Sequence, residues 1–152
     1  MVEHTNQKVR ATASCLCGSV AFEIHGPLRQ IVNCYCGQCR KTHGLMGPYT
    51  QAHWDDLVFS SDVTLKWYAS SDQAERGFCN ECGASIFWRP VQNGVAGEKV
   101  SISAGTIDPP TGLDVIGHIY VQDIADYCAM PDDGLPQFAT TSAGKLDGDL
   151  ST

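Results

Sequence analysis

The stretch Cys34-Tyr35-Cys36-Gly37-Gln38-Cys39-Arg40 places three thiols within six residues, a density that side-chain packing does not explain. Two cysteines one residue apart do not readily bridge each other, because a disulfide requires Cα atoms ~4.4–6.8 Å apart with converging Cβ vectors. Adjacent thiolates can instead converge on one zinc ion at ~2.3 Å each. Three protein ligands leave a fourth zinc position open, as in catalytic sites. The stretch therefore predicts a reactive zinc site, with Cys34, Cys36 and Cys39 as candidate catalytic residues.

The remaining cysteines form two further pairs and one isolated thiol, namely Cys15-x-Cys17, Cys79-x-x-Cys82 and Cys128. Clustered spacing without a secretion signal favours metal ligands over disulfides. With Cys128 set aside, seven clustered thiols divide into four and three. One early and one late pair usually build a structural four-cysteine site, since joining them closes a long loop. We therefore expect two zinc ions per chain, one of them structural on Cys15, Cys17, Cys79 and Cys82.

The fourth ligand of the three-thiol site is left open by the sequence. It can be water, a substrate, or one of the side chains His43, His53, His118 and Cys128. A protein side chain in that position would make this site structural as well. We expect Cys128 to be a buried inert thiol and His118 to be a surface or hydrogen-bonded histidine. Iron in the four-cysteine site, with a role in electron transfer, is a further alternative because tetrahedral thiolate sites suit both metals.

Composition limits the classes of partner. The chain has 152 residues, 43% of them hydrophobic, a net charge of −7 and a pI of about 5.0. An acidic chain has no general attraction to phosphate backbones or anionic lipid, so we expect no nucleic-acid or membrane partner. The first 14 residues lack the apolar run of a signal peptide, and no run of eighteen apolar residues occurs. We expect a soluble, cytoplasmic protein.

Alternation of apolar and polar residues at the strand period recurs along the chain between Gly, Pro and Asn turns. The Gly-rich passage Gly44 to Pro48 argues against a long helix. The fold class predicted is therefore mostly β. The expected strands cover residues 19–25, 57–59, 63–68, 85–88, 99–104 and 116–124.

The domain organisation predicted is a single domain over residues 14–138. Residues 1–13 show no periodicity and are expected to form a flexible arm. Residues 139–152 are small and polar, which predicts a disordered tail.

Four motifs extend the pattern beyond the cysteines. They are Cys15-x-Cys17-Gly18-x-Val20, Cys34-x-Cys36-x-x-Cys39-Arg40-Lys41, Phe78-Cys79-x-x-Cys82-Gly83, and His118-Ile119-Tyr120-Val121 with Gly134-Leu135-Pro136-Gln137-Phe138. Their order, spacing and flanking residues resemble the glutathione-dependent formaldehyde-activating enzyme (GFA) family, whose domain also occurs in centromere protein V-type proteins. The resemblance covers about residues 13–138. It implies a β-tent fold of stacked antiparallel sheets organised around two zinc sites, with the same division of cysteines as above.

The resemblance implies a zinc-dependent carbon–sulfur lyase of the S-(hydroxymethyl)glutathione synthase type. Its partners would be a small thiol, glutathione, as co-substrate and formaldehyde or a related small aldehyde. Arg40 and Lys41 are then candidates to bind the carboxylates of glutathione, the alternative being solvated surface charge. The chain departs from many members at Tyr35, where they carry His, and near Tyr127, where they carry Trp.

A non-catalytic reading accounts for the same cysteines. In it the chain is a zinc-stabilised β module that binds a protein partner, and the fourth ligand of the three-thiol site is the feature that distinguishes it from an enzyme. Exposed strand edges also make a homo-oligomer possible.

Overall fold

The computed structural model describes residues 8–148 and confirms the mostly β fold. It contains a single α-helix within that range, α1 (Gly37–His43), so no helix of the described chain has the length and apolar content to cross a membrane. Three short 3-10 turns cover Trp54–Asp56, Ala104–Thr106 and Val121–Asp123. The strands are β1 (Ala11–Ser14), β2 (Val20–Ile24), β3 (Ile31–Cys34), β4 (Gly47–His53), β5 (Leu57–Asp62), β6 (Leu65–Ser71), β7 (Ala74–Cys79), β8 (Ser85–Gln92), β9 (Val95–Ala96), β10 (Lys99–Ser103) and β11 (Val115–Ile119).

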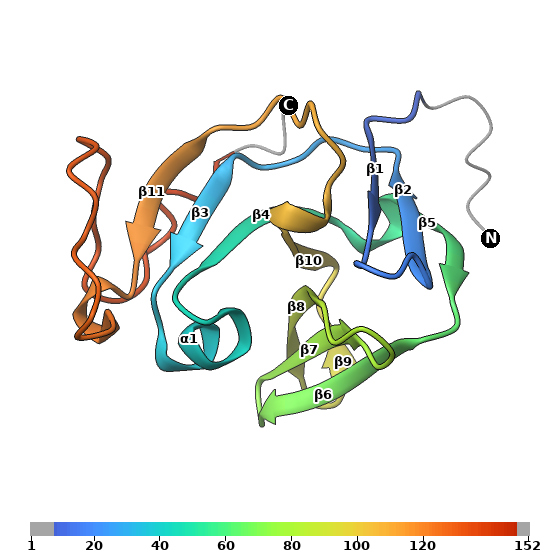
Figure 1. Ribbon diagram of the computed structural model, residues 1–152, viewed down its shortest axis with the longest axis horizontal. Helices are drawn as coiled ribbons and strands as arrows, with labels where there is room; N and C mark the ends of the chain where they lie inside the picture. The colour runs from blue at the N-terminus through green and yellow to red at the C-terminus, as the bar shows by residue number, and fades with distance from the viewer. Residues whose placement is uncertain (1–7, 149–152) are drawn as a thin grey trace.

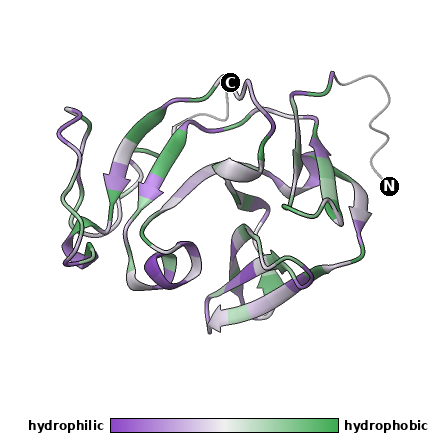
Figure 2. Cartoon of the chain, in the orientation of Figure 1, coloured by the Kyte–Doolittle hydropathy of each residue, from purple (hydrophilic) through white to green (hydrophobic). Residues whose placement is uncertain are grey.

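The strands form two stacked sheets, and neither closes into a barrel (Figure 1). The smaller sheet has the order β1-β2-β5 and the larger one the order β11-β3-β4-β10-β8-β7-β6, with β9 paired to β8. All pairs are antiparallel except β11 with β3, which is parallel and aligns Ile119 with Cys34. The expectation of purely antiparallel sheets is therefore wrong at this one edge, where the hydrophobic starts of the two strands lie side by side (Figure 2).

The main core lies between the two sheets. Val20, Phe22 and Ile24 of β2 point inward as their alternation predicts, and the Phe22 ring lies 5.1 Å from that of Phe87 on β8. Such aromatic pairs contribute ~0.5–1.5 kcal/mol each beyond their buried area. The other buried residues of this core are Ala13, Cys15, Leu28, Ala52, Leu57, Cys79, Ile86, Val100, Ile102 and Ile107.

Four strands of the large sheet, β3, β4, β7 and β9, have no counterpart among the predicted ones. β4 begins at Gly47, inside the Gly-rich passage Gly44 to Pro48, and lies between β3 and β10. Gly47 has no room for a Cβ atom, which would lie 2.5 Å from the Tyr49 ring and 3.0 Å from the His43 ring. Gly47 is therefore needed for the close packing of α1 on β4, and not for a turn. β7, which carries Arg76, was also missed.

The last predicted strand is shorter than expected. It ends at Ile119 because Tyr120 adopts a left-handed backbone conformation with φ of 55°. The chain segment 136–140 then runs beside it: the Tyr120 N–H donates to the Thr140 carbonyl at 2.9 Å and the Val121 N–H donates to the Phe138 carbonyl at 3.1 Å.

Near both ends of the described chain, residues 11–13 and 139–148 are more ordered than the sequence predicts. Residues 11–13, expected in a flexible arm, belong to β1, where Thr12 pairs with Glu23. Residues 139–148, expected in a disordered tail, pack on the fold: Leu146 is 7% exposed and fills the space beside Gly117, where a Cβ atom would lie 2.6 Å from its Cδ1. One apolar anchor in a polar segment is too weak a signal to detect by composition. Residues 1–7 and 149–152 lie outside the described residues.

Truncation of Leu146 tests this anchor. We expect Leu146→Ala to reduce the free energy of unfolding by about 2 kcal/mol, because a buried leucine side chain loses its contacts. The measurement is chemical denaturation. Leu16→Ala is the matched control, since the Leu16 side chain is 89% exposed and its truncation should change stability by less than about 0.5 kcal/mol. Equal stability of the two variants would contradict the packing of this segment.

Candidate metal centres and the adjoining cavity

The four thiols of Cys15, Cys17, Cys79 and Cys82 converge at one point, with all sulfur atoms within 4.8 Å of one another. The Cys17 sulfur lies 3.7 Å from both the Cys15 and the Cys79 sulfur. Four sulfurs bound at ~2.3 Å around a tetrahedral zinc ion would be separated by ~3.8 Å. The spacing and chemistry of these donors therefore fit a tetrahedral metal ion.

Hydrogen bonds to the sulfur atoms favour the thiolate form of part of this cluster. The backbone N–H of Cys82 and the Thr64 hydroxyl point at the Cys79 sulfur, at 3.4 and 3.2 Å, and lower the pKa of Cys79 to about 6. Burial raises the pKa of Cys15, and the Val20 N–H, which donates to the Cys15 sulfur at 3.3 Å, opposes this rise. Gly83, with φ of 77°, completes the turn after Cys82. The cluster can thus bind metal without the cost of deprotonating every thiol at neutral pH.

The position of the four-thiol cluster indicates a structural role. Cys15 directly follows β1 of the small sheet, and Cys79 ends β7 of the large sheet. Cys17 and Cys79 are 62 residues apart in the chain. A metal bound here would therefore cross-link the two sheets and close a long loop.

The thiols of Cys34, Cys36 and Cys39 form the second cluster, again with sulfur atoms within 4.8 Å of one another. Cys34 ends β3, Cys36 caps the first turn of α1 by accepting the Cys39 N–H at 3.4 Å, and Cys39 lies within that helix. Hydrogen bonds from the Cys34 and Cys39 thiols lower the pKa of Cys36 to about 2, whereas the pKa values of Cys34 and Cys39 are raised. The cluster therefore centres one thiolate among three sulfur atoms, a donor set that fits a thiolate-binding cation.

No fourth side chain joins this cluster within residues 8–148: the described His, Cys, Asp and Glu residues contribute only these three ligand atoms. The His43 ring bonds to the Tyr49 hydroxyl at 2.6 Å, and His118 is buried against Asp133 at 2.8 Å. His53 ends β4, and Cys128 is half-exposed with its thiol donating to the Ala129 carbonyl. The expectation that Cys128 is buried is wrong, because it lies in an irregular surface segment.

A cavity of about 920 Å³ adjoins the three-thiol cluster, and all three cysteines line it. Two buried arginines, Arg29 and Arg76, each 8% exposed, also line it. Neither Arg40 nor Lys41, the candidates for carboxylate binding, is among its lining residues. Both belong to α1, but the positive charge inside the cavity comes from other elements. A site of this size and polarity suits a small anionic ligand.

Arg76 joins the cluster to a short polar chain. Its Nη2 lies 3.9 Å from the Cys39 sulfur, its Nη1 donates to the Tyr49 hydroxyl at 3.2 Å, and its Nε donates to Gln38 at 3.2 Å. Since Arg76 can only donate, the Tyr49 hydroxyl directs its own proton to the Nε2 atom of His43. Burial raises the pKa of Tyr49 and lowers that of His43, so the phenol keeps its proton and the ring is neutral.

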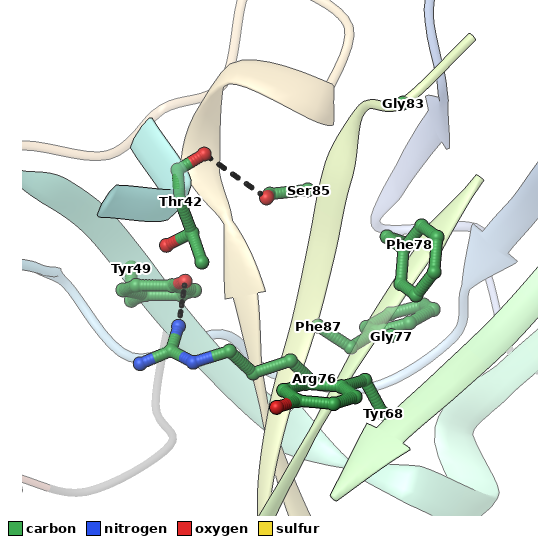
Figure 3. A pocket seen from close by; sticks show the side chains of 9 residues that line it. All are labelled: Thr42, Tyr49, Tyr68, Arg76, Gly77, Phe78, Gly83, Ser85 and Phe87. Carbon is green, nitrogen blue, oxygen red and sulfur yellow. Dashed lines mark hydrogen bonds between the residues drawn. The ribbon is translucent and has the colours of Figure 1, made fainter. Parts of the chain in front are cut away.

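A second cavity, of about 360 Å³, shares Tyr49 and Arg76 with the first, and Figure 3 shows the residues that line it. Thr42 and Ser85 also line it, and the Ser85 hydroxyl donates to the Thr42 carbonyl at 3.3 Å. Arg76 and Tyr49 therefore line two hollow regions of the molecule.

Sequence reasoning missed Arg29, Tyr49 and Arg76. Arg29 lies in an irregular stretch before β3, and Tyr49 and Arg76 lie on β4 and β7, which the periodicity did not reveal. The one available signal was Arg76 itself, a charged residue between the small or apolar residues Ala74 and Phe78. Because residues two apart on a strand point to the same face, Arg76 shares a face of β7 with Ala74 once the strand is assigned.

Tyr35, where the sequence departs from the family pattern, does not line the cavity. It is 4% exposed, and its ring packs edge-on against His118 with centroids 5.8 Å apart. His118 in turn bonds to Asp133, and its Nδ1 atom lies 3.5 Å from the Asn33 amide. This polar cluster supports β3 and β11 from the side away from the cavity.

Comparison with known proteins agrees with the motifs. Residues 10–123 match the family described as glutathione-dependent formaldehyde-activating enzyme, GFA. The chain belongs to the GFA family. No match was found among curated proteins.

A crystal structure of a Rhodobacter sphaeroides protein from structural genomics resembles the GFA chain described here. The TM-score is 0.51 with 19% sequence identity, over 83% of this chain and 98% of the other. At this identity the resemblance supports the fold alone.

We expect two zinc ions per chain, held with unequal affinity. Four converging thiolates should retain one ion against a mild chelator, whereas three thiolates beside an open cavity should release the other first. Elemental analysis of the purified protein and timed release into a colorimetric chelator provide the measurement. One ion per chain, or two released at the same rate, would contradict two distinct sites.

Substitution of single cysteines should separate the roles of the two clusters. We expect Cys79→Ser to abolish cooperative thermal unfolding, because the link between the sheets and the binding energy of its metal are lost together. Cys36→Ser should leave a folded protein. Circular dichroism and thermal melting measure both, with Cys128→Ser as control because that thiol lies outside both clusters. Equal loss of structure in the two cluster variants would contradict the assignment.

Proposed function

We propose that this protein is a zinc-dependent carbon–sulfur lyase that reversibly adds glutathione to formaldehyde or a related small aldehyde, an activity of the S-(hydroxymethyl)glutathione synthase type. The observation that supports it is the cluster of Cys34, Cys36 and Cys39, which lines a cavity of about 920 Å³ and has no fourth protein ligand within residues 8–148. Membership of the GFA family supports the same class of reaction.

Cys34, Cys36 and Cys39 would hold the zinc ion, with its remaining position directed to the cavity. Free thiols with a pKa of ~8.5 are only about 3% ionised at neutral pH, and bound zinc supplies a site at which an incoming thiol ionises fully, a gain of about 30-fold. Arg76, 3.9 Å from the Cys39 sulfur, adds a positive charge that stabilises thiolates in this cluster.

In the forward reaction the thiol sulfur bonds to the aldehyde carbon, and the carbonyl double bond becomes a C–O single bond. The proton lost by the thiol must reach the new oxygen, so no other reactant is consumed. Tyr49 lines the cavity and keeps its proton, which its hydroxyl shares with His43. We assign Tyr49 as the group that holds a proton near the aldehyde oxygen.

The remaining lining fits a peptide-like thiol. It combines amide and hydroxyl side chains with the apolar surfaces of Trp88, Pro90 and Leu146. Its volume lies within the ~300–1,000 Å³ typical of small-molecule sites. Glutathione and free cysteine ligands both require a reducing compartment, which favours the cytoplasm.

Cobalt in place of zinc provides a direct test of thiol binding. We expect glutathione to change the sulfur-to-cobalt absorption, because its thiolate enters the open position of the three-thiol site. The spectrum should stay unchanged in Cys36→Ser protein. An unchanged spectrum in the wild type would favour the non-catalytic module.

Catalysis requires a separate measurement. We expect the zinc-loaded protein to accelerate the interconversion of S-(hydroxymethyl)glutathione with free glutathione plus formaldehyde. NMR exchange spectroscopy at equilibrium measures this rate. Cys36→Ser should return the exchange to the spontaneous rate while the four-thiol site stays filled, and Tyr49→Phe should slow it by about 100-fold if a positioned proton donor is lost. Thiol binding without faster exchange would contradict the lyase assignment.

A further inference from the structure

Arg29 is a buried cation inside the cavity of the three-thiol cluster. It is 8% exposed and lines that cavity together with Cys34, Cys36 and Cys39. Arg29 lies just before β3 (Ile31–Cys34), the strand that ends at Cys34 of the cluster. Five residues of extended chain span at most about 18 Å, so the arginine lies within reach of a ligand attached at the thiol cluster.

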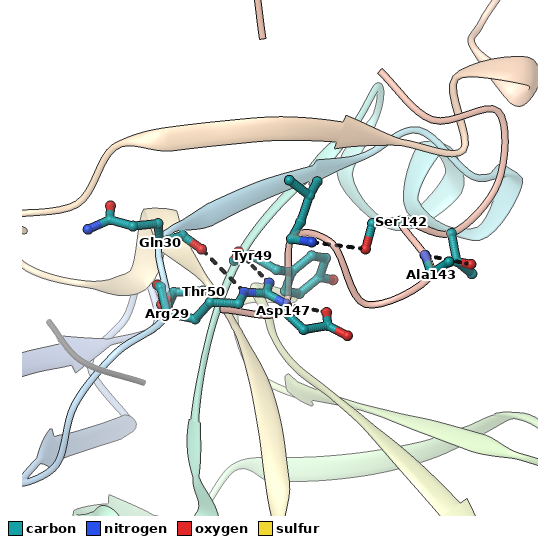
Figure 4. A network of polar contacts seen from close by, with 9 residues as sticks. Arg29, Gln30, Tyr49, Thr50, Ser142, Ala143 and Asp147 are labelled. Carbon is teal, nitrogen blue, oxygen red and sulfur yellow. Dashed lines mark hydrogen bonds and ion pairs between the residues drawn. The ribbon is translucent and has the colours of Figure 1, made fainter. Parts of the chain in front are cut away.

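Neutral acceptors hold the guanidinium of Arg29 in place (Figure 4). Its Nε donates to the Gln30 carbonyl at 3.2 Å and its Nη2 donates to the Tyr49 carbonyl at 3.0 Å. The Thr50 hydroxyl also donates to the carbonyl of Arg29. These bonds fix the plane of the guanidinium but leave its charge uncompensated, which is unfavourable for a buried cation.

Asp147 supplies the compensating charge, but only loosely. Its carboxylate lies 3.8 Å from the Nη1 atom of Arg29, beyond hydrogen-bond distance, and its side chain is 66% exposed. An ion pair of this kind is worth little, because water and salt screen the exposed partner. The pair can therefore be replaced by an anion that approaches the guanidinium more closely.

The segment that carries Asp147 forms one wall of the cavity. Thr141 to Gly144, Leu146 and Asp147 all line it. Leu146 is anchored against Gly117 of β11, and its backbone N–H donates to the Ser142 hydroxyl at 3.4 Å. This segment follows residues 10–123, the part of the chain that matches the GFA family. A carboxylate outside the matched region is thus held at the arginine of the cavity.

We propose that Arg29 binds a carboxylate of the thiol substrate and that Asp147 occupies this position in the free protein. The inference rests on the proposed function and specifies its substrate class: a thiol that carries a carboxylate several bonds from sulfur, as a peptide thiol does. The planar fork of arginine matches two carboxylate oxygens, an arrangement that the distant Asp147 does not achieve. A simple thiol without a carboxylate leaves the Arg29–Asp147 pair intact.

S-Methylglutathione is the probe for this site, because it keeps both carboxylates but has no thiol to ionise on a metal. We expect calorimetry with the metal-loaded full chain to show that Asp147→Asn binds this probe about threefold more tightly than the wild type, since a competing anion is removed. Arg29→Gln should bind it at least about tenfold more weakly, because a charge-assisted hydrogen-bond partner is lost.

Matched controls separate this effect from general changes of charge and folding. Asp62→Asn alters the net charge equally but lies at an exposed position of β5, outside the cavity, and should leave binding unchanged. The diethyl ester of S-methylglutathione should bind weakly and equally to wild type and Asp147→Asn. If Arg29→Gln fails to fold, the Asp147→Asn result decides alone, because that side chain is on the surface.

The outcomes distinguish this proposal from the proposed function. Tighter probe binding by Asp147→Asn without accelerated formaldehyde exchange would support the carboxylate site and overturn the lyase. Accelerated exchange with unchanged probe binding in Asp147→Asn would support the lyase and overturn the role of Asp147 and Arg29. Equal tightening in Asp62→Asn would also overturn it, since net charge would then be the cause.

Discussion

The convergence of two cysteine pairs that are 62 residues apart is the constraint on which the rest of the structure depends. One pair follows the first strand of the small sheet and the other lies at the end of β7 in the large sheet, so their meeting point fixes how the sheets stack. The hydrophobic core between the two sheets is small, because the strands that contribute its side chains are short. A metal held by four thiolates would add a cross-link where apolar burial alone is limited.

The same arrangement determines what surrounds the three-thiol cluster. β3 and the residues just before it bring Cys34 and Arg29 to one cavity. The neighbouring strand β4 adds Tyr49, and β7, further along the large sheet, adds Arg76. Each arginine is buried and is held by neutral oxygen acceptors. The cavity therefore combines a cluster of metal-binding sulfur atoms with fixed positive charge on its walls, a combination suited to a ligand that bears both a thiol and a carboxylate.

Both ends of the sequence show why composition is a poor guide to order. The segment 139–148 is polar and small, yet Leu146 fits the space that Gly117 leaves open. Ala11–Ser14 forms a strand because β2 offers a free edge, although its own residues show little alternation. In each case the partner surface, and not the segment, determines the structure.

The sequence by itself determined the family, the β class and the division of seven cysteines into four and three, because these follow from local spacing and from the strand period. It also placed the inward face of β2 correctly, since alternation is a property of the strand alone. Only the tertiary structure decided which charges reach the cavity. Arg40 and Lys41 are adjacent to Cys39 in the chain, but Arg29 and Arg76 are the arginines that line the site. Which residues are neighbours across a sheet depends on the strand order and register. Contacts between segments distant in the chain set both, and local sequence patterns do not predict these contacts.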